Sequence, residues 1–283
     1  MNPPVRGSLE ADGYQILTGF LSPGQVDEAR HLVDRRVARP ASRSCERPNN
    51  TLVPLRWNDD LVALVHGERQ QVRDVVQAAD LRFISAYISV KEPFSPPLWW
   101  HQDWWAWDHP ATYEAEPPQV ALLCYLQDTT VTSGALRVLP GTHLRSIGLH
   151  ALLPEAHSDE SSALDLAHPA MSDHALQRTL AVRAGDAVVT DYRLLHGTHA
   201  NMAAHRRDAL LVSFAPAWSS LDESLRAHLI SHPALPADGE RVPGRLEELM
   251  PAFAGTRRDR ALNREAPAVF RAADARGLAG SGD

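Results

Sequence analysis

The middle of the chain, residues 81–218, carries short segments rich in β-branched and aromatic residues, separated by turn residues. These segments are LRFISAYISV (81–90), QVALLCYL (119–126), ALRVLP (135–140), TLAVRAGDAVVTDYRLL (179–195) and RRDALLVSFAPAW (206–218). Such residues favour strands, and many short strands joined by turns are typical of a sandwich or barrel. The pattern therefore predicts a mainly β fold, here a jelly roll.

The segments on either side of this region favour helices. Ser22-Pro23 is a typical helix start, apolar residues then recur at helical spacing, and Pro40 ends the helix. Residues 41–57 are expected to be loop, and a second helix is expected from about Asp59, interrupted near Gly67. The segment 221–232 returns to a helical pattern.

These patterns suggest one domain over 1–283. We expect a loose arm at 1–12 within a helical part at 1–80, and a jelly-roll core at 81–218. Within the core, the His-, Ser- and Asp-rich stretch 150–177 is expected to be an insertion over one face. C-terminal helices and a frayed tail are expected over 219–283.

Composition excludes several classes of function. The 283 residues are 44% hydrophobic and carry a formal net charge of −7, with no basic stripe that could follow a phosphate backbone. No apolar segment is long enough to span a membrane, and no signal peptide is expected. The two cysteines form no metal or redox motif. We expect a cytoplasmic monomer or homodimer that acts on a small molecule, with no nucleic-acid or membrane partner.

The segment LWWHQDWWAWDHP (98–110) carries the chemistry. His101 and Asp103 are two residues apart, and in a strand such residues point to the same face. A second histidine would complete a facial triad, which leaves positions on a metal open for other ligands. His196, at the end of the predicted strand VVTDYRLLH and before Gly197, is a candidate, and so is His199. Spacing alone does not decide between them.

Three segments together resemble the phytanoyl-CoA dioxygenase family of iron(II)- and 2-oxoglutarate-dependent oxygenases. They are the HQD segment at 101–103, GALRVLPGTH at 134–143 and LLHGTHANMAAHRRDALLVSF at 194–214, in the family's order. The resemblance extends over about residues 80–215. It implies a double-stranded β-helix (jelly roll, cupin-like), an iron(II) ion, 2-oxoglutarate as cosubstrate, and O2.

Matched residue by residue, the resemblance places iron on His101, Asp103 and His196. It makes Arg207, eleven residues after His196, the clamp for the distal carboxylate of 2-oxoglutarate. An arginine suits this role because its planar fork pairs with a carboxylate through two parallel hydrogen bonds. Arg206 would face the other side of its strand and ranks second.

Further positions follow from the same match. Thr198 corresponds to a residue that helps bind the same carboxylate, and Lys91 to a lysine that contacts the cosubstrate in part of the family. Leu123 departs from the pattern, since many members carry Trp there, so the pocket near the cosubstrate is expected to differ in shape. Trp107 and Tyr87 are candidates for the substrate pocket, with packing roles as the alternative.

The remaining histidines are given lesser roles. His143 is expected to cap or pack beside a turn, and those of the insertion are expected to be solvated unless the insertion acts as a lid. These insertion residues are His150, His157, His168 and His174.

The resemblance implies a dioxygenase that oxidises, above all hydroxylates, a small or medium-sized biosynthetic intermediate and releases succinate and CO2. Related halogenases carry a small residue in place of Asp103, so the carboxylate favours oxygen chemistry. One alternative is a cupin-type metal enzyme, either an isomerase or a 2-oxoglutarate-independent dioxygenase, which would not need Arg207. The other is a non-catalytic ligand-binding jelly roll.

Overall fold

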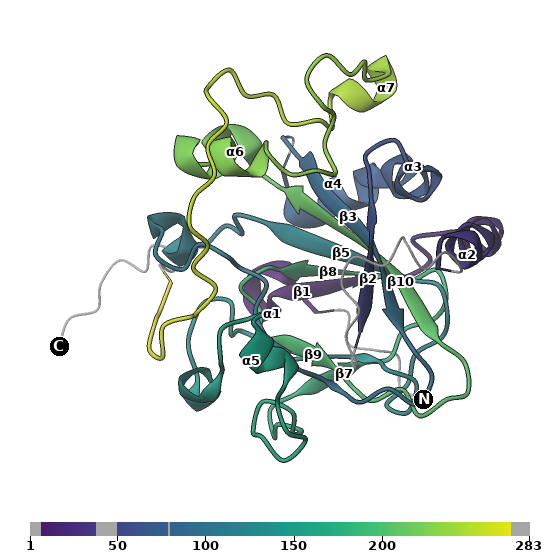
Figure 1. Cartoon of the computed structure of the whole chain (residues 1–283), viewed down its shortest axis with the longest axis vertical. Helices are drawn as coiled ribbons and strands as arrows, with labels where there is room; N and C mark the ends of the chain where they lie inside the picture. The colour runs from purple at the N-terminus through teal and green to yellow at the C-terminus, as the bar shows by residue number, and fades with distance from the viewer. Residues whose placement is uncertain (1–6, 38–49, 79, 273–283) are drawn as a thin grey trace.

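The strands form two antiparallel sheets in the computed structural model, which describes residues 7–37, 50–78 and 80–272 (Figure 1). The larger sheet contains, in spatial order, β1 (Tyr14–Leu17), β8 (Ala187–Asp191), β5 (Val120–Tyr125), β10 (Arg207–Ala215), β3 (Arg82–Lys91) and β2 (Thr51–Leu55). The smaller sheet contains β4 (Leu98–His101), β9 (His196–Thr198), β6 (Leu136–Val138) and β7 (Arg178–Leu180). The predicted mainly β architecture is confirmed.

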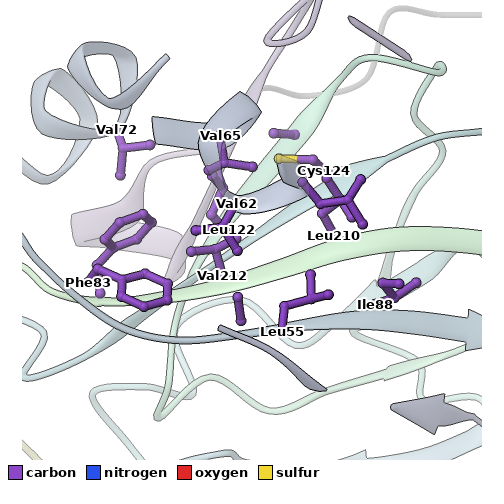
Figure 2. Packing of buried hydrophobic residues seen from close by; sticks show 14 of the residues in the cluster. Leu55, Val62, Val65, Val72, Phe83, Ile88, Leu122, Cys124, Leu210 and Val212 are labelled. Carbon is purple, nitrogen blue, oxygen red and sulfur yellow. The ribbon is translucent and has the colours of Figure 1, made fainter. Parts of the chain in front are cut away.

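Helices cover the outer face of the larger sheet. They are α2 (Pro23–Val37), α3 (Asp60–Gly67) and α4 (Arg69–Val76). Figure 2 shows Val62, Val65 and Val72 from α3 and α4 packed with Leu122 and Val212 from the sheet. Burying this apolar surface is the main favourable contribution to folding, and it leaves the opposite face of the sheet free for the site.

Side chains alternate along the central strand β10. Leu210, Val212 and Phe214 belong to the core under the helices, whereas Arg207 and Leu211 line a cavity on the other face. The inner faces of the two sheets also share an apolar cluster with members from β5, β6 and β8. The space between the sheets therefore contains both packed side chains and the candidate site.

Local signals fix the N-terminal helices as predicted. Ser22 and Gln25 form a reciprocal cap at the start of α2: the Gln25 backbone N–H donates to the Ser22 hydroxyl over 3.4 Å, and the Ser22 N–H donates to Gln25 Oε1 over 2.8 Å. Asp59 caps α3 by accepting from the Leu61 N–H over 3.0 Å, and α3 ends at Gly67. The break near Gly67 is thus confirmed.

The shorter elements lie around this frame. They include the α-helices α1 (Leu9–Asp12), α5 (Asp159–Ser162), α6 (Glu223–Leu229) and α7 (Gly244–Glu247). The described residues also form 3₁₀ helices at Pro110–Tyr113, Gly148–Leu152 and Trp218–Ser220. After α7 the described residues, up to 272, run back along one side of the molecule without a helix (Figure 1). Within the described ranges, no helix has the length and apolarity to cross a membrane.

Three predictions of secondary structure were wrong. Thr51–Leu55, expected to be loop, forms the edge strand β2, and Leu9–Asp12, expected to be a loose arm, forms α1. The predicted single strand VVTDYRLLH is instead two: β8 ends at Asp191, and β9 begins at His196 in the other sheet. The short edge strand β2 and the crossing from β8 to β9 depend on distant partners, which local sequence does not show. Residues 1–6, 38–49 and 273–283, where the predicted helix end at Pro40 and other loop and tail predictions fall, are outside the described ranges.

A buried ion pair holds the crossing between the sheets. Arg193 and Asp191 are 0% and 1% exposed, and their closest side-chain atoms are 2.7 Å apart. The Arg193 guanidinium also donates to the carbonyls of Thr112 and Glu114 over 2.9 and 2.6 Å. The segment that leads into His196 is therefore anchored three residues before it.

Replacing Arg193 with methionine should leave the Asp191 carboxylate buried without its charge partner. We expect Arg193→Met to lower the free energy of unfolding by about 3–5 kcal/mol in urea denaturation. Arg178→Met is the control, because its ion pair with Asp12 lies at the surface, with the two side chains 45% and 23% exposed, and should contribute at most about 1 kcal/mol. Equal losses in the two variants would contradict this assignment.

Candidate metal centre and adjoining cavities

Two histidines face each other across neighbouring strands of the smaller sheet. His101, the last residue of β4, pairs directly with His196, the first residue of β9, and their ring centroids are 4.2 Å apart. Each Nδ1 lies near the carbonyl oxygen two residues earlier: Trp99 O at 2.9 Å and Leu194 O at 3.0 Å. A proton on Nδ1 donates to that oxygen, so each Nε2 keeps its lone pair for a metal.

Asp103 completes the cluster from outside the strand. The prediction that His101 and Asp103 share a strand was wrong, because β4 ends at His101. The carboxylate still reaches the histidines: its oxygens lie 3.6 Å from His101 Nε2 and 3.6 Å from His196 Nε2. One ligand atom from each residue lies within 4.8 Å of the others, a spacing that one ion could bridge.

The backbone on either side of Asp103 is held by the crossing segment. The Gln102 side-chain amide donates to the Arg193 carbonyl, and the Trp104 N–H donates to the Tyr192 carbonyl over 2.9 Å. Because these carbonyls precede His196 by only a few residues, the same contacts fix both halves of the cluster relative to each other.

Gly197 is needed for the close approach of β4 and β9. A Cβ atom at this position would lie 2.7 Å from the Leu98 carbonyl oxygen and 2.8 Å from that of Trp99. Any side chain here would therefore push the two strands apart. The glycine lies within β9, and its role is to let the two histidines meet.

The charge states suit a divalent cation. Burial and the neighbouring His196 ring hold the pKa of His101 well below its usual value, so the ring is neutral at physiological pH. Burial would raise the pKa of Asp103, but His196, the hydrogen bond from His157 and the His101 ring outweigh it and hold that pKa far below its usual value. Asp103 is therefore ionised, as a metal ligand must be.

The competing residues lie elsewhere. His199 Nε2 is 2.8 Å from the Thr179 hydroxyl on β7, away from the cluster. Arg206 pairs with Asp208 over 2.9 Å and with Asp34 near the surface. His196 and not His199 therefore belongs to the cluster, a choice that sequence spacing alone left open. Arg207 and not Arg206 lines the cavity beside it.

A cavity of about 80 Å³, here called the inner cavity, opens from the cluster between the sheets. Arg207, Thr198 and Tyr125 line it, and each has a buried polar side-chain atom without a hydrogen-bond partner among the described residues. Leaving buried donors unpaired is unfavourable. Three such donors beside a metal cluster fit a ligand that brings a carboxylate, as 2-oxoglutarate does. Leu123 also lines this cavity.

Lys91, the single lysine of the chain, lies behind this cavity rather than among its lining residues. It is fully buried, and its Nζ donates to the Pro96 carbonyl over 2.7 Å. Its aliphatic stem fills the space beside Gly134, where a Cβ atom would lie 2.7 Å from Lys91 Cδ. Burial, followed by the charges of Arg207 and Arg137, lowers its pKa to about 6.

A second cavity of about 400 Å³, here called the outer cavity, adjoins the first. Leu52, Asp103, His157 and Leu211 line both, so the two cavities meet at the metal cluster. A volume of this size is typical of a pocket for a small molecule.

The structure gives the two predicted substrate residues different places. Tyr87 lines the outer cavity and shares a hydrogen bond of 3.1 Å with His232. Trp107 lines neither cavity and packs at 5.0 Å between centroids against Phe270. The tryptophan of this segment that lines the outer cavity is instead Trp105, two residues earlier.

His157 is the site residue that the sequence did not reveal. Expected to be solvated, it instead lies 2.9 Å from Asp103 Oδ1 and lines both cavities. Its backbone has a φ of 63°, which is uncommon for a residue other than glycine. His150, also expected to be solvated, is buried. His143 packs as expected, with Nε2 3.0 Å from the Glu10 carbonyl.

Buried contacts tie the insertion to the metal strands. The Trp100 N–H donates to the Ala170 carbonyl over 2.7 Å, and the Trp100 indole donates to the Ser172 carbonyl over 2.9 Å. Arg137 from β6 donates to the carbonyls of Met171 and Ser172 over 3.1 and 3.0 Å. The insertion is therefore a fixed wall of the site.

We expect Lys91→Met to stabilise the protein at neutral pH. The unfolded chain holds a proton on this amine up to its ordinary pKa of 10.5, whereas the folded protein releases it above about pH 6. Between these values the stability of the wild type should therefore gain up to about 1.4 kcal/mol per pH unit from this group. Urea denaturation from pH 6 to 9 should show the Met variant losing this slope. Parallel curves for the two proteins would contradict the shift.

Comparisons with known proteins identify relatives in sequence and in fold. Ectoine dioxygenase from Nocardia farcinica is 26% identical over 238 residues, covering 78% of this chain and 80% of that protein. The epimerase SnoN from nogalamycin biosynthesis, solved with Fe3+, alpha ketoglutarate and nogalamycin RO, has a TM-score of 0.57 at 21% identity, over 87% of this chain and 93% of that one. HygX from Streptomyces hygroscopicus, solved with nickel, 2-oxoglutarate and hygromycin B, has a TM-score of 0.54 at 19% identity, over 74% and 84%.

The jelly-roll prediction is confirmed by these solved structures, which share the fold. The family model of Phytanoyl-CoA dioxygenase (PhyH) matches residues 9–209, well over half of the chain. The match includes all three residues of the metal cluster as well as Thr198 and Arg207. The chain therefore belongs to the phytanoyl-CoA dioxygenase family of iron(II)- and 2-oxoglutarate-dependent oxygenases.

Proposed function

We propose that the protein is a dioxygenase that holds iron(II) with His101, Asp103 and His196 and binds 2-oxoglutarate in the inner cavity. It oxidises, above all hydroxylates, a small or medium-sized biosynthetic intermediate in the outer cavity, with release of succinate and CO2. The observation that carries this proposal is that the cluster and the unpaired Arg207 open into the same cavity.

When bound, iron and 2-oxoglutarate together supply the activation of O2, and the protein's task is to bind, orient and shield. His101, Asp103 and His196 would hold the ion as a facial triad, a ligand set that leaves coordination sites for other ligands. Arg207 provides a charged fork for the distal carboxylate. The Thr198 hydroxyl, which lacks a partner among the described residues, can donate to the same group.

Arg207 is suited to this task by burial. Its side chain is 2% exposed, and its guanidinium lies 5.5 Å above the Tyr125 ring. Burial lowers the pKa of Arg207, with Tyr125 and Asp208 opposing the shift. A carboxylate that pairs with it away from water gains more than it would at the surface.

His157 acts on the metal through Asp103 and is therefore a positioning residue. By donating from Nε2 to Asp103 Oδ1, it fixes the rotation of the carboxylate. Partners of metal ligands commonly set ligand orientation in this way. The contact also links the insertion to the metal, since 54 residues separate the two side chains.

The substrate end of the proposal rests on the outer cavity and on analogy. SnoN is solved with nogalamycin RO and HygX with hygromycin B, which favours a role in natural-product biosynthesis here too. A cytoplasmic location and a monomer or homodimer are part of the same proposal. The competing functions are a cupin-type enzyme without 2-oxoglutarate and a non-catalytic binding protein. Neither of them explains why a buried arginine, Arg207, lines the inner cavity.

The iron chelate of 2-oxoglutarate provides a direct test. Adding iron(II) and 2-oxoglutarate without oxygen should give the weak visible charge-transfer band of the chelate. Arg207→Ala should weaken 2-oxoglutarate binding roughly 100-fold in a titration of this band, because charge-assisted hydrogen bonds are lost. Arg206→Ala is the matched control and should leave the affinity unchanged, since Arg206 pairs near the surface.

The band's absence in the wild type, or its full strength in Arg207→Ala, would overturn the proposal. His101→Ala and Asp103→Ala should lose both the band and turnover while their unfolding midpoints stay near that of the metal-free wild type. Unfolding of both variants would instead favour a purely structural pair.

His157→Ala should weaken metal binding about 10–100-fold, because the Asp103 carboxylate loses its fixed orientation. Titration with iron(II) without oxygen measures this loss. His157→Gln should recover part of the affinity, since an amide can also donate to Asp103. His174→Ala is the control within the insertion, where His174 only accepts a local bond from Leu176. Unchanged affinity in His157→Ala would show that the contact is incidental.

A further inference from the structure

The outer cavity is lined by two side chains with a full charge, which differ in the ligand that each can bind. Two of its lining residues are Asp103 and Arg264, which carry opposite full charges. Burial lowers the pKa of His232 to about 4, and burial also lowers that of His228. Burial raises the pKa of Tyr87, so that side chain is neutral as well. Apart from His157, whose side chain pairs with Asp103, the cavity therefore presents one carboxylate, one guanidinium and these neutral polar groups at neutral pH.

In the proposed complex the Asp103 carboxylate binds the metal, whereas the Arg264 guanidinium binds neither the metal nor 2-oxoglutarate. Iron(II) contributes +2, Asp103 −1, bound 2-oxoglutarate −2 and Arg207 +1, so the proposed cosubstrate complex is neutral without Arg264. The charge of Arg264 is then the excess in the cavity. An uncompensated charge in a partly buried site is unfavourable, which leaves the loaded site suited to an anion.

The backbone beside Arg264 is fixed by the hydrogen bonds of its neighbour Asn263. The Asn263 N–H donates to the Trp105 carbonyl over 2.9 Å, and the Trp107 N–H donates to the Asn263 carbonyl over 3.2 Å. The C-terminal segment 251–272 is thereby fixed beside the strand end that carries the metal ligands. Arg264 reaches the cavity from this fixed position.

The side chain of Arg264 has no acidic partner in the part of the chain that the structure describes. Arg257 and Arg260, from the same segment, pair with Asp238 and Asp108, both over 2.6 Å. Arg264 makes no such pair, and its buried Nε lacks a hydrogen-bond partner among the described residues. Asp259 lies 3.6 Å from His228 but does not line the cavity.

The remaining wall is aromatic and apolar. Trp105 stacks at 4.6 Å between centroids against His228 and donates to Gln119 over 2.9 Å. Ile84 and Leu229 extend this surface. The cavity thus offers a flat apolar wall near a charged fork, which suits a molecule with an apolar or ring-shaped body and one anionic group.

We propose that the primary substrate is a small organic anion and that Arg264 binds its anionic oxygens while the Trp105 side of the cavity receives its apolar body. This inference rests on the proposed function, because the charge balance assumes bound iron and 2-oxoglutarate. The anionic group is a carboxylate or a phosphoryl group, both of which match the guanidinium fork.

The test uses the full chain loaded with nickel(II) and saturating 2-oxoglutarate, so that Arg207 is occupied and no turnover occurs. Matched probes are added in sets that differ only in charge: benzoate, phenylphosphonate and benzamide, and phenylacetate with phenylacetamide. L-Proline and L-prolinamide form a third set. Binding is measured as the rise in the thermal unfolding midpoint and then as Kd by calorimetry for each probe that gives a rise.

We expect at least one acid to bind tenfold or more tightly than its amide, and Arg264→Gln to abolish that preference. A preference for benzoate over phenylphosphonate assigns a carboxylate, and the reverse assigns a phosphoryl group. Arg257→Gln, on the same segment but exposed, should keep the preference. Equal binding of acids and amides, no binding of any probe, or a retained preference in Arg264→Gln would overturn the inference.

The charge-transfer band separates the two proposals. Arg264→Gln should give the same band with iron(II) and 2-oxoglutarate as the wild type, because Arg264 does not line the inner cavity. A normal band without any preference for anions overturns this inference alone. A missing band in the wild type overturns the proposed function.

Discussion

The pairing of His101 with His196 across β4 and β9 is the constraint on which the site depends. It places both rings on one face, and each ring is oriented by the carbonyl two residues earlier in the chain, that of Trp99 for His101 and that of Leu194 for His196. Gly197 allows the strands to approach this closely, and the ion pair of Arg193 fixes the segment that enters β9. A metal site built in this way is held by backbone geometry before any ion binds, which reduces the ordering needed on binding.

The inner cavity keeps buried polar groups that a purely structural core would have paired. Arg207, Thr198 and Tyr125 each have a buried polar atom without a hydrogen-bond partner among the described residues. Such arrangements reduce stability and are usually kept where a ligand compensates for them. The free energy lost in the empty protein is then recovered when a dicarboxylate binds, so stability and cosubstrate affinity are linked.

The sequence predicted the parts of the structure that depend on local patterns. The capped helix at Pro23–Val37, the strand at Arg82–Lys91 and the order of the motifs needed no distant contact. The edge strands Tyr14–Leu17 and Thr51–Leu55 were missed because their identity comes from pairing with β8 and β3. His157 was missed for the same reason: it reaches Asp103 from an insertion with no periodicity of its own. The three-residue cluster was found because its ligands lie in recognisable motifs.

Reaction and substrate are encoded in different parts of the chain. The cluster and Arg207, the proposed carboxylate clamp, lie on or directly beside strands β4, β9 and β10, whose positions the fold determines. The outer cavity is completed by the insertion that carries His157, by α6 and by the C-terminal segment that carries Arg264. Loops and terminal segments vary without disturbing the sheets, so family membership defines the chemistry more narrowly than the molecule it acts on. For this chain, information about the substrate is therefore concentrated outside the jelly-roll strands, in the segments that close the outer cavity.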